Sequence, residues 1–209
     1  MTKSKQILLA TIGSLLFVAC SGEAKKEAEV ETPKPCIYNY DEASTSVNWT
    51  AFKFTEKTGV GGTFDKVNVL ISSPAEDMYT TLTGASFTIP IETVNSANED
   101  RDGKIQAHFF GAMASTDVIS GIVKSISETA ATVEITMNGV SKDYEGAVTV
   151  EGEKISFACT IDMTDFEAGY AIDSLNTVCD DLHKGKDGIS KLWTEVDINV
   201  ETTLKKTCP

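Results

Sequence analysis

The sequence contains little that supports catalysis or metal binding. Histidine occurs only twice, as His108 and His183, and there is no C-x₂-C pair. A glycine-rich phosphate loop and the nucleophile elbow of hydrolases are also missing. These absences argue against a zinc site, a nucleotide-dependent enzyme and a serine hydrolase. We therefore expect a protein that is not an enzyme and that carries no catalytic cofactor or metal.

Basic residues are scarce. The chain of 209 residues has 18 Lys and Arg against 31 Asp and Glu, which gives a formal net charge of -13. An acidic surface without charge patterning repels phosphate backbones, so nucleic-acid binding is not expected.

No apolar run is long enough to cross a membrane. The longest, residues 7–19 (ILLATIGSLLFVA), falls short of the roughly 20 residues that a spanning helix needs. It follows Lys3 and Lys5, which is typical of a secretory signal peptide. Phe17-Val-Ala-Cys20 resembles a bacterial lipobox, with Phe17 where leucine usually stands. We predict a lipoprotein signal peptide over residues 1–19 and a lipid anchor on Cys20.

The anchor predicts a place in the bacterial cell envelope. Ser21 after the lipidated cysteine is compatible with sorting to the outer membrane, facing the periplasm or the surface. Residues 21–35 (SGEAKKEAEVETPKP) have almost no large apolar side chains, so they cannot bury enough surface to fold. We expect residues 20–36 to form a lipidated, flexible linker and residues 37–209 to form one domain.

Four cysteines remain besides Cys20. An even number in an exported protein favours two disulfides over a metal site, for which Cys179-x₃-His183 supplies only two ligands. Of the three possible pairings, we favour Cys36 with Cys208, which joins the two ends of the domain, and Cys159 with Cys179. A strained Cys159–Cys179 bond would also allow a redox function.

The domain is predicted to consist mainly of β-strands, because apolar residues recur at every second position. This alternation predicts an antiparallel sheet with one wet face. The patterned positions are Ala85, Phe87, Ile89 and Ile91; Val133, Ile135 and Met137; Ile155, Phe157, Cys159, Ile161 and Met163; and Val196, Ile198, Val200, Thr202 and Leu204.

Three local signals refine this pattern. Val47, Trp49 and Ala51 would lie on one face of a strand, whereas the following Phe52 and Phe54 would lie on the other face. This change of face predicts a bulge near Ala51. Asn138-Gly139 predicts a tight hairpin. Residues 98–113 and 164–181 interrupt the alternation and predict two short helical excursions. The resulting fold class is all-β, an extended antiparallel barrel of about eight strands.

Several segments resemble the YceI-like family when they are taken in order. These segments are Ser46-VNWTAFKF with Val60-GGTF, Phe87-TIPIETVN through Arg101-Asp102 to His108-Phe-Phe, Met137-NGVSK, and Ile161-Asp162 with Asp165-Phe166. The resemblance spans residues 46–203. The cysteines, residues 165–193 and the lipid anchor depart from the general family pattern.

The resemblance implies a lipocalin-like barrel that holds a polyisoprenoid or a related amphiphile such as a quinone, without catalysis. The partners expected are therefore an isoprenoid-type lipid and the membrane that receives the anchor. The opposite interpretation is a filled core in a structural or interaction barrel, since alternation alone does not distinguish a cavity from a packed interior. The predicted ligand-binding residues are Trp49, Phe54, Phe64, Phe87, Ile89, Phe109, Phe110, Val133, Ile135, Phe157, Ile161, Val196 and Ile198.

Two smaller signals concern residues 98–109. His108, beside two phenylalanines, is either a structural residue or a polar clamp for a ligand head group. Asn98-x-Asp100-x-Asp102-Gly matches the first half of an EF-hand loop, but Phe109 stands where the bidentate glutamate is needed. We therefore reject a calcium site.

Overall fold

The structure is a computed structural model that describes residues 34–114 and 117–209, so the predictions for the signal peptide and Cys20 lie outside the described residues. Residues Lys34–Pro209 form one compact unit. Its strands are β1 (Ile37–Tyr40), β2 (Ser46–Lys53), β3 (Thr58–Phe64), β4 (Asn68–Leu70), β5 (Ser86–Pro90), β6 (Val94–Asn95), β7 (Val118–Ile126), β8 (Ala130–Met137), β9 (Val140–Glu151), β10 (Lys154–Asp162) and β11 (Leu192–Thr207).

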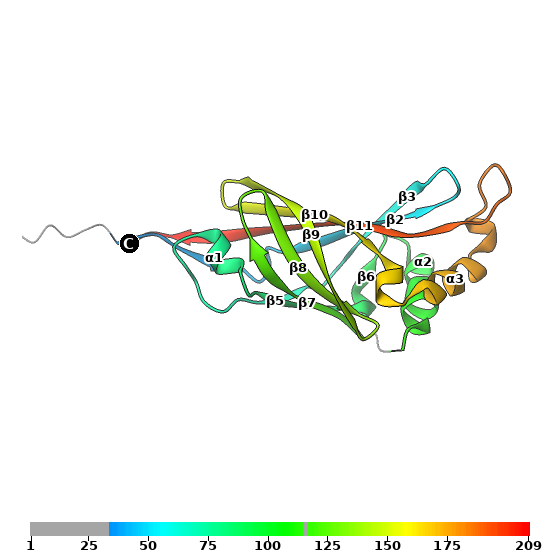
Figure 1. The fold of residues 1–209 in the computed structure, drawn as a ribbon, viewed down its shortest axis with the longest axis horizontal. Coiled ribbons are helices and arrows are strands. Elements are labelled where there is room, and N and C mark those ends of the chain that lie inside the picture. The colour runs from blue at the N-terminus through cyan, green and yellow to red at the C-terminus, as the bar shows by residue number, and fades with distance from the viewer. Residues whose placement is uncertain (1–33, 115–116) are drawn as a thin grey trace, which may run out of the picture. The chain divides into compact units, whose positions relative to one another are not determined.

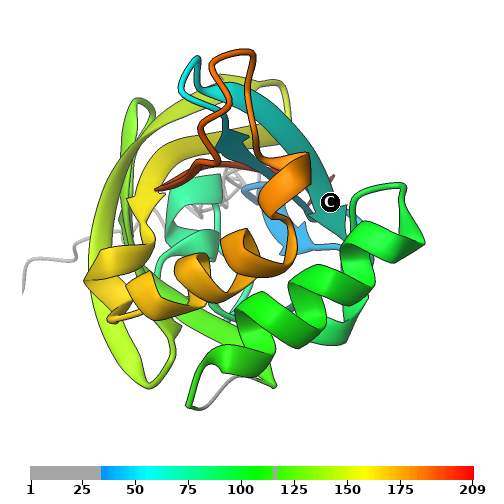
Figure 2. The same ribbon diagram turned by 90° about the vertical axis from the view of Figure 1, so that its right-hand side faces the viewer.

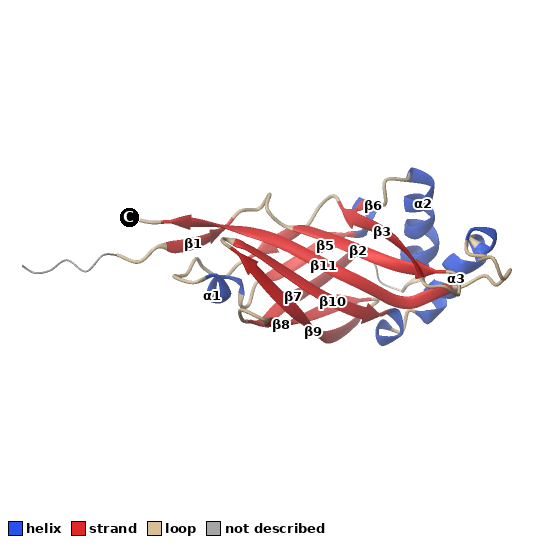
Figure 3. Ribbon diagram, turned by 90° about the horizontal axis from the view of Figure 1, so that it is seen from above, coloured by secondary structure: helices blue, strands red, loops and turns tan. Residues whose placement is uncertain are grey.

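All neighbouring strands pair antiparallel in one sheet of order β4-β5-β7-β8-β9-β10-β11-β2-β3-β6, and β1 adds to β11. The sheet curls into a half-barrel whose strands run along the long axis of the domain (Figures 1 and 3). The all-β antiparallel fold class is therefore confirmed. The count of eight strands was low because β1, β4 and β6 have only four, three and two residues, too few to show alternation.

The irregularity predicted near Ala51 lies on the neighbouring strand. Pairing of β2 with β3 runs without interruption to Lys53, opposite Thr58. The register shift occurs in β11, between Leu192 opposite Lys53 and Val196 opposite Ala51. The extra residues of β11 change the twist there, and β2 ends at Lys53 before a turn that places Phe54 at φ 62°.

The hairpin between β8 and β9 forms at the predicted dipeptide. Asn138 and Gly139 both have positive φ, at 52° and 74°, as the two central residues of a type I′ turn require. Asn138 also donates from its amide to the carbonyl of Phe166 at 2.9 Å. The turn therefore fixes both the register of the hairpin and the position of the segment that follows β10.

Both predicted helical excursions are confirmed, and they lie across one end of the curled sheet (Figure 2). The first comprises α2 (Glu99–Lys104), the π-helix η2 (Ile105–Phe109) and the 3₁₀ helix η3 (Phe110–Ala112). The second comprises η4 (Met163–Phe166), α3 (Gly169–Val178) and η5 (Asp180–Leu182). Two further short helices were not predicted: α1 (Met78–Leu82) and η1 (Ile91–Thr93). Among the described residues, no helix is both long and apolar enough to cross a bilayer.

One of the two predicted disulfides forms. Cys36 and Cys208 are bonded, with Cα atoms 4.2 Å apart and a sequence separation of 172. They join the chain just before β1 to the chain just after β11, at the end of the domain opposite α2 and α3 (Figure 1).

The predicted Cys159–Cys179 disulfide is wrong, since both residues are free thiols. Cys159 lies within β10, opposite Ile198 of β11. Cys179 ends α3, where the nearby charges that act on it include Lys104 and Asp100 of α2. Closeness in sequence was misleading because the excursion carries Cys179 away from β10. Burial raises the pKa of the Cys159 thiol to about 11, so a redox role based on this pair loses its support.

Candidate functional site

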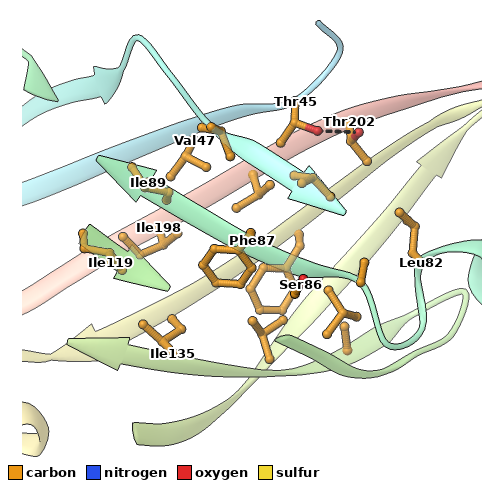
Figure 4. Close-up of a pocket in the computed structure, with 18 of the residues that line it drawn as sticks. Thr45, Val47, Leu82, Ser86, Phe87, Ile89, Ile119, Ile135, Ile198 and Thr202 are labelled. Atoms are coloured by element: carbon orange, nitrogen blue, oxygen red, sulfur yellow. Dashed lines mark hydrogen bonds between the residues drawn. The ribbon is translucent and has the colours of Figure 1, made fainter. Parts of the chain in front are cut away.

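The concave side of the sheet encloses an apolar cavity of about 160 Å³, here called the sheet chamber. Side chains from most strands of the half-barrel form its wall, and Leu82 of α1 joins them (Figure 4). The lining consists of Tyr40, Thr45, Val47, Phe64, Val67, Val69, Leu82, Ala85, Ser86, Phe87, Ile89, Ile119, Val123, Ile126, Ala131, Val133, Ile135, Met137, Ile155, Phe157, Ile161, Ile198, Val200 and Thr202.

A second cavity of about 120 Å³, here called the helix chamber, lies where the two excursions meet the sheet. Its lining consists of Trp49, Ala51, Phe64, Val94, Ile105, Phe109, Phe110, Ile119, Met137, Ile161, Met163, Ile172, Leu175, Leu192, Trp193, Val196 and Ile198. Five residues line both chambers, namely Phe64, Ile119, Met137, Ile161 and Ile198. The two chambers therefore adjoin along the barrel axis.

Twelve of the thirteen predicted lining residues lie on the wall of one or both chambers. Phe54 is the exception. Its backbone, just beyond β2, is held by a hydrogen bond from its N–H to Lys191 O at 2.9 Å and by one from Trp193 Nε1 to its carbonyl at 2.7 Å. The Lys53 ammonium lies over the Phe54 ring, 4.6 Å from the ring centroid. The positive φ at Phe54 breaks the alternation on which the prediction rested.

Sequence reasoning found Phe109 and Phe110 of the first excursion but missed other residues that line the helix chamber. Ile105 comes from the π-helix η2, Ile172 and Leu175 come from α3, and Trp193 comes from the irregular start of β11. The i, i+3 spacing of Ile172 and Leu175 was a usable signal for one apolar helix face. What that face covers depends on how the excursion packs, which no local pattern reveals.

The interior stays hollow because large rings lie flat against glycines in the wall. A Cβ atom at Gly62 would stand 2.2 Å from the Trp49 ring, and one at Gly121 would stand 2.4 Å from the Phe87 ring. Each of these pairs sits directly opposite in neighbouring strands. Without side chains at these two positions, the rings approach the sheet closely and leave the axis of the barrel open.

Phe157 of β10 also lies against a glycine, Gly146 of β9, which is diagonal to it in the register, and an added Cβ there would stand 2.4 Å from its ring. Figure 4 shows Phe87 over the wall with Ile119 and Ile135 beside it. The predicted aromatic residues thus form the wall of a cavity rather than a plug, which argues against a filled core.

Three residues of the sheet-chamber lining carry hydroxyl groups that bond to one another and leave the wall almost purely apolar. Tyr40 Oη lies 2.8 Å from Thr45 Oγ1, and Thr45 Oγ1 lies 2.8 Å from Thr202 Oγ1. Figure 4 shows the Thr45–Thr202 contact. Ser44 Oγ extends the chain at 3.3 Å from Thr202 and donates to the carbonyl of Asp41 at 2.7 Å. Burial raises the pKa of Tyr40, so its hydroxyl stays protonated at neutral pH.

The residues of the half EF-hand pattern form hydrogen bonds at the start of the first helical excursion. The Asn98 side chain accepts from the backbone N–H of Arg101 at 3.0 Å and caps α2. Asp102 accepts from the backbone N–H of Ser96 at 2.8 Å. No group of three metal-ligating side chains occurs in the described part of the chain. His108 lies in η2 but is not among the lining residues of either chamber, which gives no support to a clamp role.

An antiparallel sheet curled around an apolar cavity defines the class of barrels that enclose small hydrophobic ligands. Within that class, the family model of the YceI-like domain matches residues 38–204. The chain belongs to this family. The resemblance read from its sequence segments is confirmed.

Curated relatives include a UPF0312 protein of Staphylococcus aureus strain USA300, which is 26% identical over 106 residues. The match covers 51% of this chain and 60% of that protein, so the chain spans less than two thirds of the length of the curated relatives it matches.

Solved structures with a similar fold include a polyisoprenoid-binding domain from Saccharophagus degradans, with a TM-score of 0.56, 16% identity, and coverage of 83% of this chain and 98% of that one. Burkholderia cenocepacia BcnA has a TM-score of 0.55 and 15% identity, with coverage of 79% and 98%. A YceI protein of Campylobacter jejuni has a TM-score of 0.53 and 20% identity, with coverage of 75% and 90%. These similarities establish the fold.

Proposed function

We propose that this chain is a membrane-anchored protein that binds or carries an isoprenoid-type lipid, such as a quinone, in its two chambers. The observation that carries the proposal is the pair of adjoining chambers with almost purely apolar walls inside a YceI-like barrel. The similarity to a structure described as a polyisoprenoid-binding domain supports the choice of ligand class.

The size of the chambers favours a long, thin ligand. A dry apolar cavity of about 150 Å³ accommodates a molecule as small as benzene, and the sheet chamber measures about 160 Å³. A prenyl chain that runs past the five shared residues would occupy both chambers. Its affinity would come from the area-proportional hydrophobic term of about 25 cal/mol per Å², summed along the chain.

The anchor on Cys20 would complete this function. One acyl chain holds a protein only marginally at a bilayer, whereas two or more give stable attachment. A diacylated Cys20 followed by the linker of residues 20–36 would keep the barrel near the bilayer in which isoprenoid lipids dissolve. We propose a place in the cell envelope, at the outer membrane, for this reason.

The test of ligand binding is organic extraction of protein purified from a quinone-producing bacterial host, followed by mass spectrometry. We expect a prenyl lipid in the wild-type extract and its depletion from an Ala131→Phe variant, in which a ring is added to the wall of the sheet chamber. Repeated recovery of empty wild-type protein would contradict the proposal and favour an interaction barrel without a ligand.

The test of anchoring is membrane fractionation of wild-type protein and a Cys20→Ser variant expressed in parallel. We expect the wild type in the membrane fraction and the variant as soluble protein or unprocessed precursor. A Cys159→Ser variant is the matched control and should fractionate as the wild type does. Identical fractionation of all three proteins would show that Cys20 carries no anchor.

A further inference from the structure

Two loops project together at the end of the domain that lies opposite the Cys36–Cys208 disulfide (Figure 1). One is residues 53–57, at the turn between β2 and β3, and the other is residues 182–193, which lead from η5 into β11. These two segments are here called the basic tip.

Hydrogen bonds hold the two loops of the basic tip together. The backbone N–H of Phe54 donates to the carbonyl of Lys191 at 2.9 Å, and Trp193 Nε1 donates to the carbonyl of Phe54 at 2.7 Å. Thr55 Oγ1 donates to the carboxylate of Asp187 at 2.6 Å. The side chains of both loops therefore belong to one surface.

The charge of the basic tip is opposite in sign to that of the whole chain. Its five lysines stand against two carboxylates, Glu56 and Asp187, which gives a formal charge of +3 in a chain of net charge -13. Within the described residues, no carboxylate lies at ion-pair distance from Lys53, Lys186 or Lys191. These three ammonium groups are therefore available to an anionic partner.

The other two lysines of the basic tip are paired within the protein. Lys57 forms an ion pair with Glu195, and Lys184 forms ion pairs with Asp180 and Asp181. These pairs neutralise the nearest carboxylates outside the two loops, so they leave the three unpaired lysines as the charge that the tip presents.

Two of the unpaired lysines lie over aromatic rings. The Lys191 ammonium lies 3.6 Å from the centroid of the Trp193 ring, and the Lys53 ammonium lies 4.6 Å from that of the Phe54 ring. Lysine and tryptophan both combine an apolar body with a polar end, which suits them to the level of the head groups in a bilayer.

Exposed apolar side chains are concentrated beside these cations. Six large apolar side chains are exposed in the described part of the chain, and four of them lie between Tyr170 and Ile189. Leu182 is 56% exposed and Ile189 is 54% exposed. Ile189 lies at a tight turn, in which the backbone N–H of Gly185 donates to its carbonyl at 3.2 Å. Apolar groups next to unpaired lysines form a surface that matches the boundary between head groups and acyl chains.

We propose that the basic tip docks on the surface of a bilayer that contains anionic phospholipids. Its unpaired lysines contact the head-group phosphates, and Leu182 and Ile189 enter the boundary with the acyl chains. An acidic protein would also attract the lysines, but it would need an apolar surface placed to cover both exposed side chains. A bilayer supplies the negative charge and the apolar layer together.

Docking brings the helix chamber next to the lipid. Leu192 and Trp193 belong to the basic tip and also line that chamber. The linker of residues 20–36 spans at most about 55 Å when fully extended, and the 16 residues of β11 span about 53 Å. A protein anchored through Cys20 therefore has enough linker to turn over and place its tip on the same bilayer. Docking does not depend on the cargo and goes beyond the proposed function.

The test is co-sedimentation of purified Cys20→Ser protein, which cannot carry the lipid anchor, with unilamellar vesicles. One population is phosphatidylcholine alone, and the other is an equal mixture of phosphatidylcholine and phosphatidylglycerol. We expect at least tenfold tighter binding to the mixed vesicles at low ionic strength. This preference should disappear in roughly 1 M salt, at which the Debye length is about 3 Å.

A charge-matched pair of variants in the Cys20→Ser background assigns binding to the basic tip. Lys186→Gln with Lys191→Gln removes two unpaired lysines of the tip, whereas Lys205→Gln with Lys206→Gln removes two exposed lysines near the opposite end of β11. We expect the tip variant to bind mixed vesicles about 10- to 30-fold more weakly. The control has the same net charge and should bind as its parent does. Any contribution of residues 1–36 is common to all three proteins.

A second pair of variants tests the apolar contact. Ile189→Ser should weaken binding to mixed vesicles about three- to tenfold, because a partly inserted side chain is lost. Leu70→Ser, at a side chain of β4 that is 73% exposed, is the control and should leave vesicle binding unchanged. Thermal melts show that the variants remain folded.

The outcomes separate docking from the proposed function. No preference for mixed vesicles would overturn docking and leave an acidic protein as the partner of the tip. Equal losses in the two charge variants would overturn it as well, since net charge alone would then explain binding. Recovery of a prenyl lipid from a protein that does not bind vesicles would overturn docking alone. Vesicle binding by a protein that repeatedly lacks such a lipid would overturn the proposed cargo and leave docking intact.

Discussion

The two chambers adjoin but are built differently. The sheet chamber is walled mainly by strands of the curled sheet, so its shape follows largely from register and from the glycines beneath the rings. The helix chamber is closed by η2 and α3, which belong to connections between strands. The wall of the sheet chamber is therefore preformed. The helices η2 and α3 form a lid over the helix chamber, and the position of this lid depends on a few tertiary contacts.

This difference assigns separate roles to the two ends of the barrel. The end with the disulfide is fixed covalently. The other end is covered by short helices, including one π-helical turn, a form that is rare and frequent at functional sites. We expect the end covered by short helices to adapt more readily to ligand length.

Removing the disulfide should have the largest effect. A Cys36→Ser, Cys208→Ser double variant frees a loop that spans 172 residues, so we expect a loss of about 3–5 kcal/mol in the free energy of unfolding. Chemical denaturation measures this loss. Cys159→Ala with Cys179→Ala, which breaks no disulfide, is the control and should cost clearly less. Equal losses would show that the disulfide makes no specific contribution to the free energy of unfolding.

Filling one chamber at a time should separate their contributions to binding. Ala131→Phe places a ring in the sheet chamber, and Ala51→Phe places the same ring in the helix chamber. We expect Ala131→Phe to weaken prenyl-quinone binding about 50- to 100-fold, since roughly 100 Å² of ligand contact would be lost. Ala51→Phe should weaken only long-tailed ligands. An equal effect on short-tailed and long-tailed ligands would contradict the occupation of both chambers by one long ligand.

The attachment of the lid to the wall can be tested at two tyrosines. Tyr144 of β9 donates its hydroxyl proton to Asp165 of η4 at 2.8 Å, and burial together with this hydrogen bond raises its pKa. Tyr144→Phe should destabilise the protein by about 0.5–1.5 kcal/mol. Tyr170→Phe on α3 removes a longer bond, 3.3 Å to Asn138, from a more exposed ring and should cost less. Thermal melts of the two variants give the comparison.

The smallest expected effect is a pH dependence of stability, and it originates in the lid. Burial lowers the pKa of His183 below its ordinary 6.5, and the nearby Lys53 acts in the same direction. The unfolded chain therefore binds more protons than the folded one as pH falls through 6.5. Stability should then be complete above that value and decline toward the lowered pKa.

Melts between pH 7 and 5.5 in a His108→Gln background isolate this histidine, because the chain has only two. Adding His183→Gln should flatten the pH dependence in this window. The carboxylates whose pKa values are lowered, such as Asp162 and Asp187, act only at more acidic pH. A slope that survives the second substitution would show that His183 is not its source.

Much of the wall of the sheet chamber was predictable from sequence. Alternation identified Phe87, Ile89, Val133 and Ile135 as inward residues, because a strand with one buried face must repeat every second residue. The lid was not predictable to the same degree. Its existence followed from the break in alternation, but its partners depend on contacts between segments far apart in the sequence.

The errors have the same origin. Cys159 and Cys179 are close in sequence but are carried apart by α3, and Phe54 leaves the inward face because of a turn with positive φ. The Thr45–Thr202 hydroxyl contact joins residues more than 150 positions apart, so no local motif could reveal it. Each depends on geometry that is set by pairing and packing elsewhere in the chain.

The sequence by itself determined the antiparallel strands and the type I′ turn at Asn138-Gly139, since these follow from local periodicity and turn chemistry, and it favoured but did not determine the bond between Cys36 and Cys208. Only the tertiary structure decided that the interior is hollow. The rings of Trp49 and Phe87 find glycines opposite them in neighbouring strands, and register between strands, which no single strand encodes, determines whether a ring fills the axis or lies against the wall.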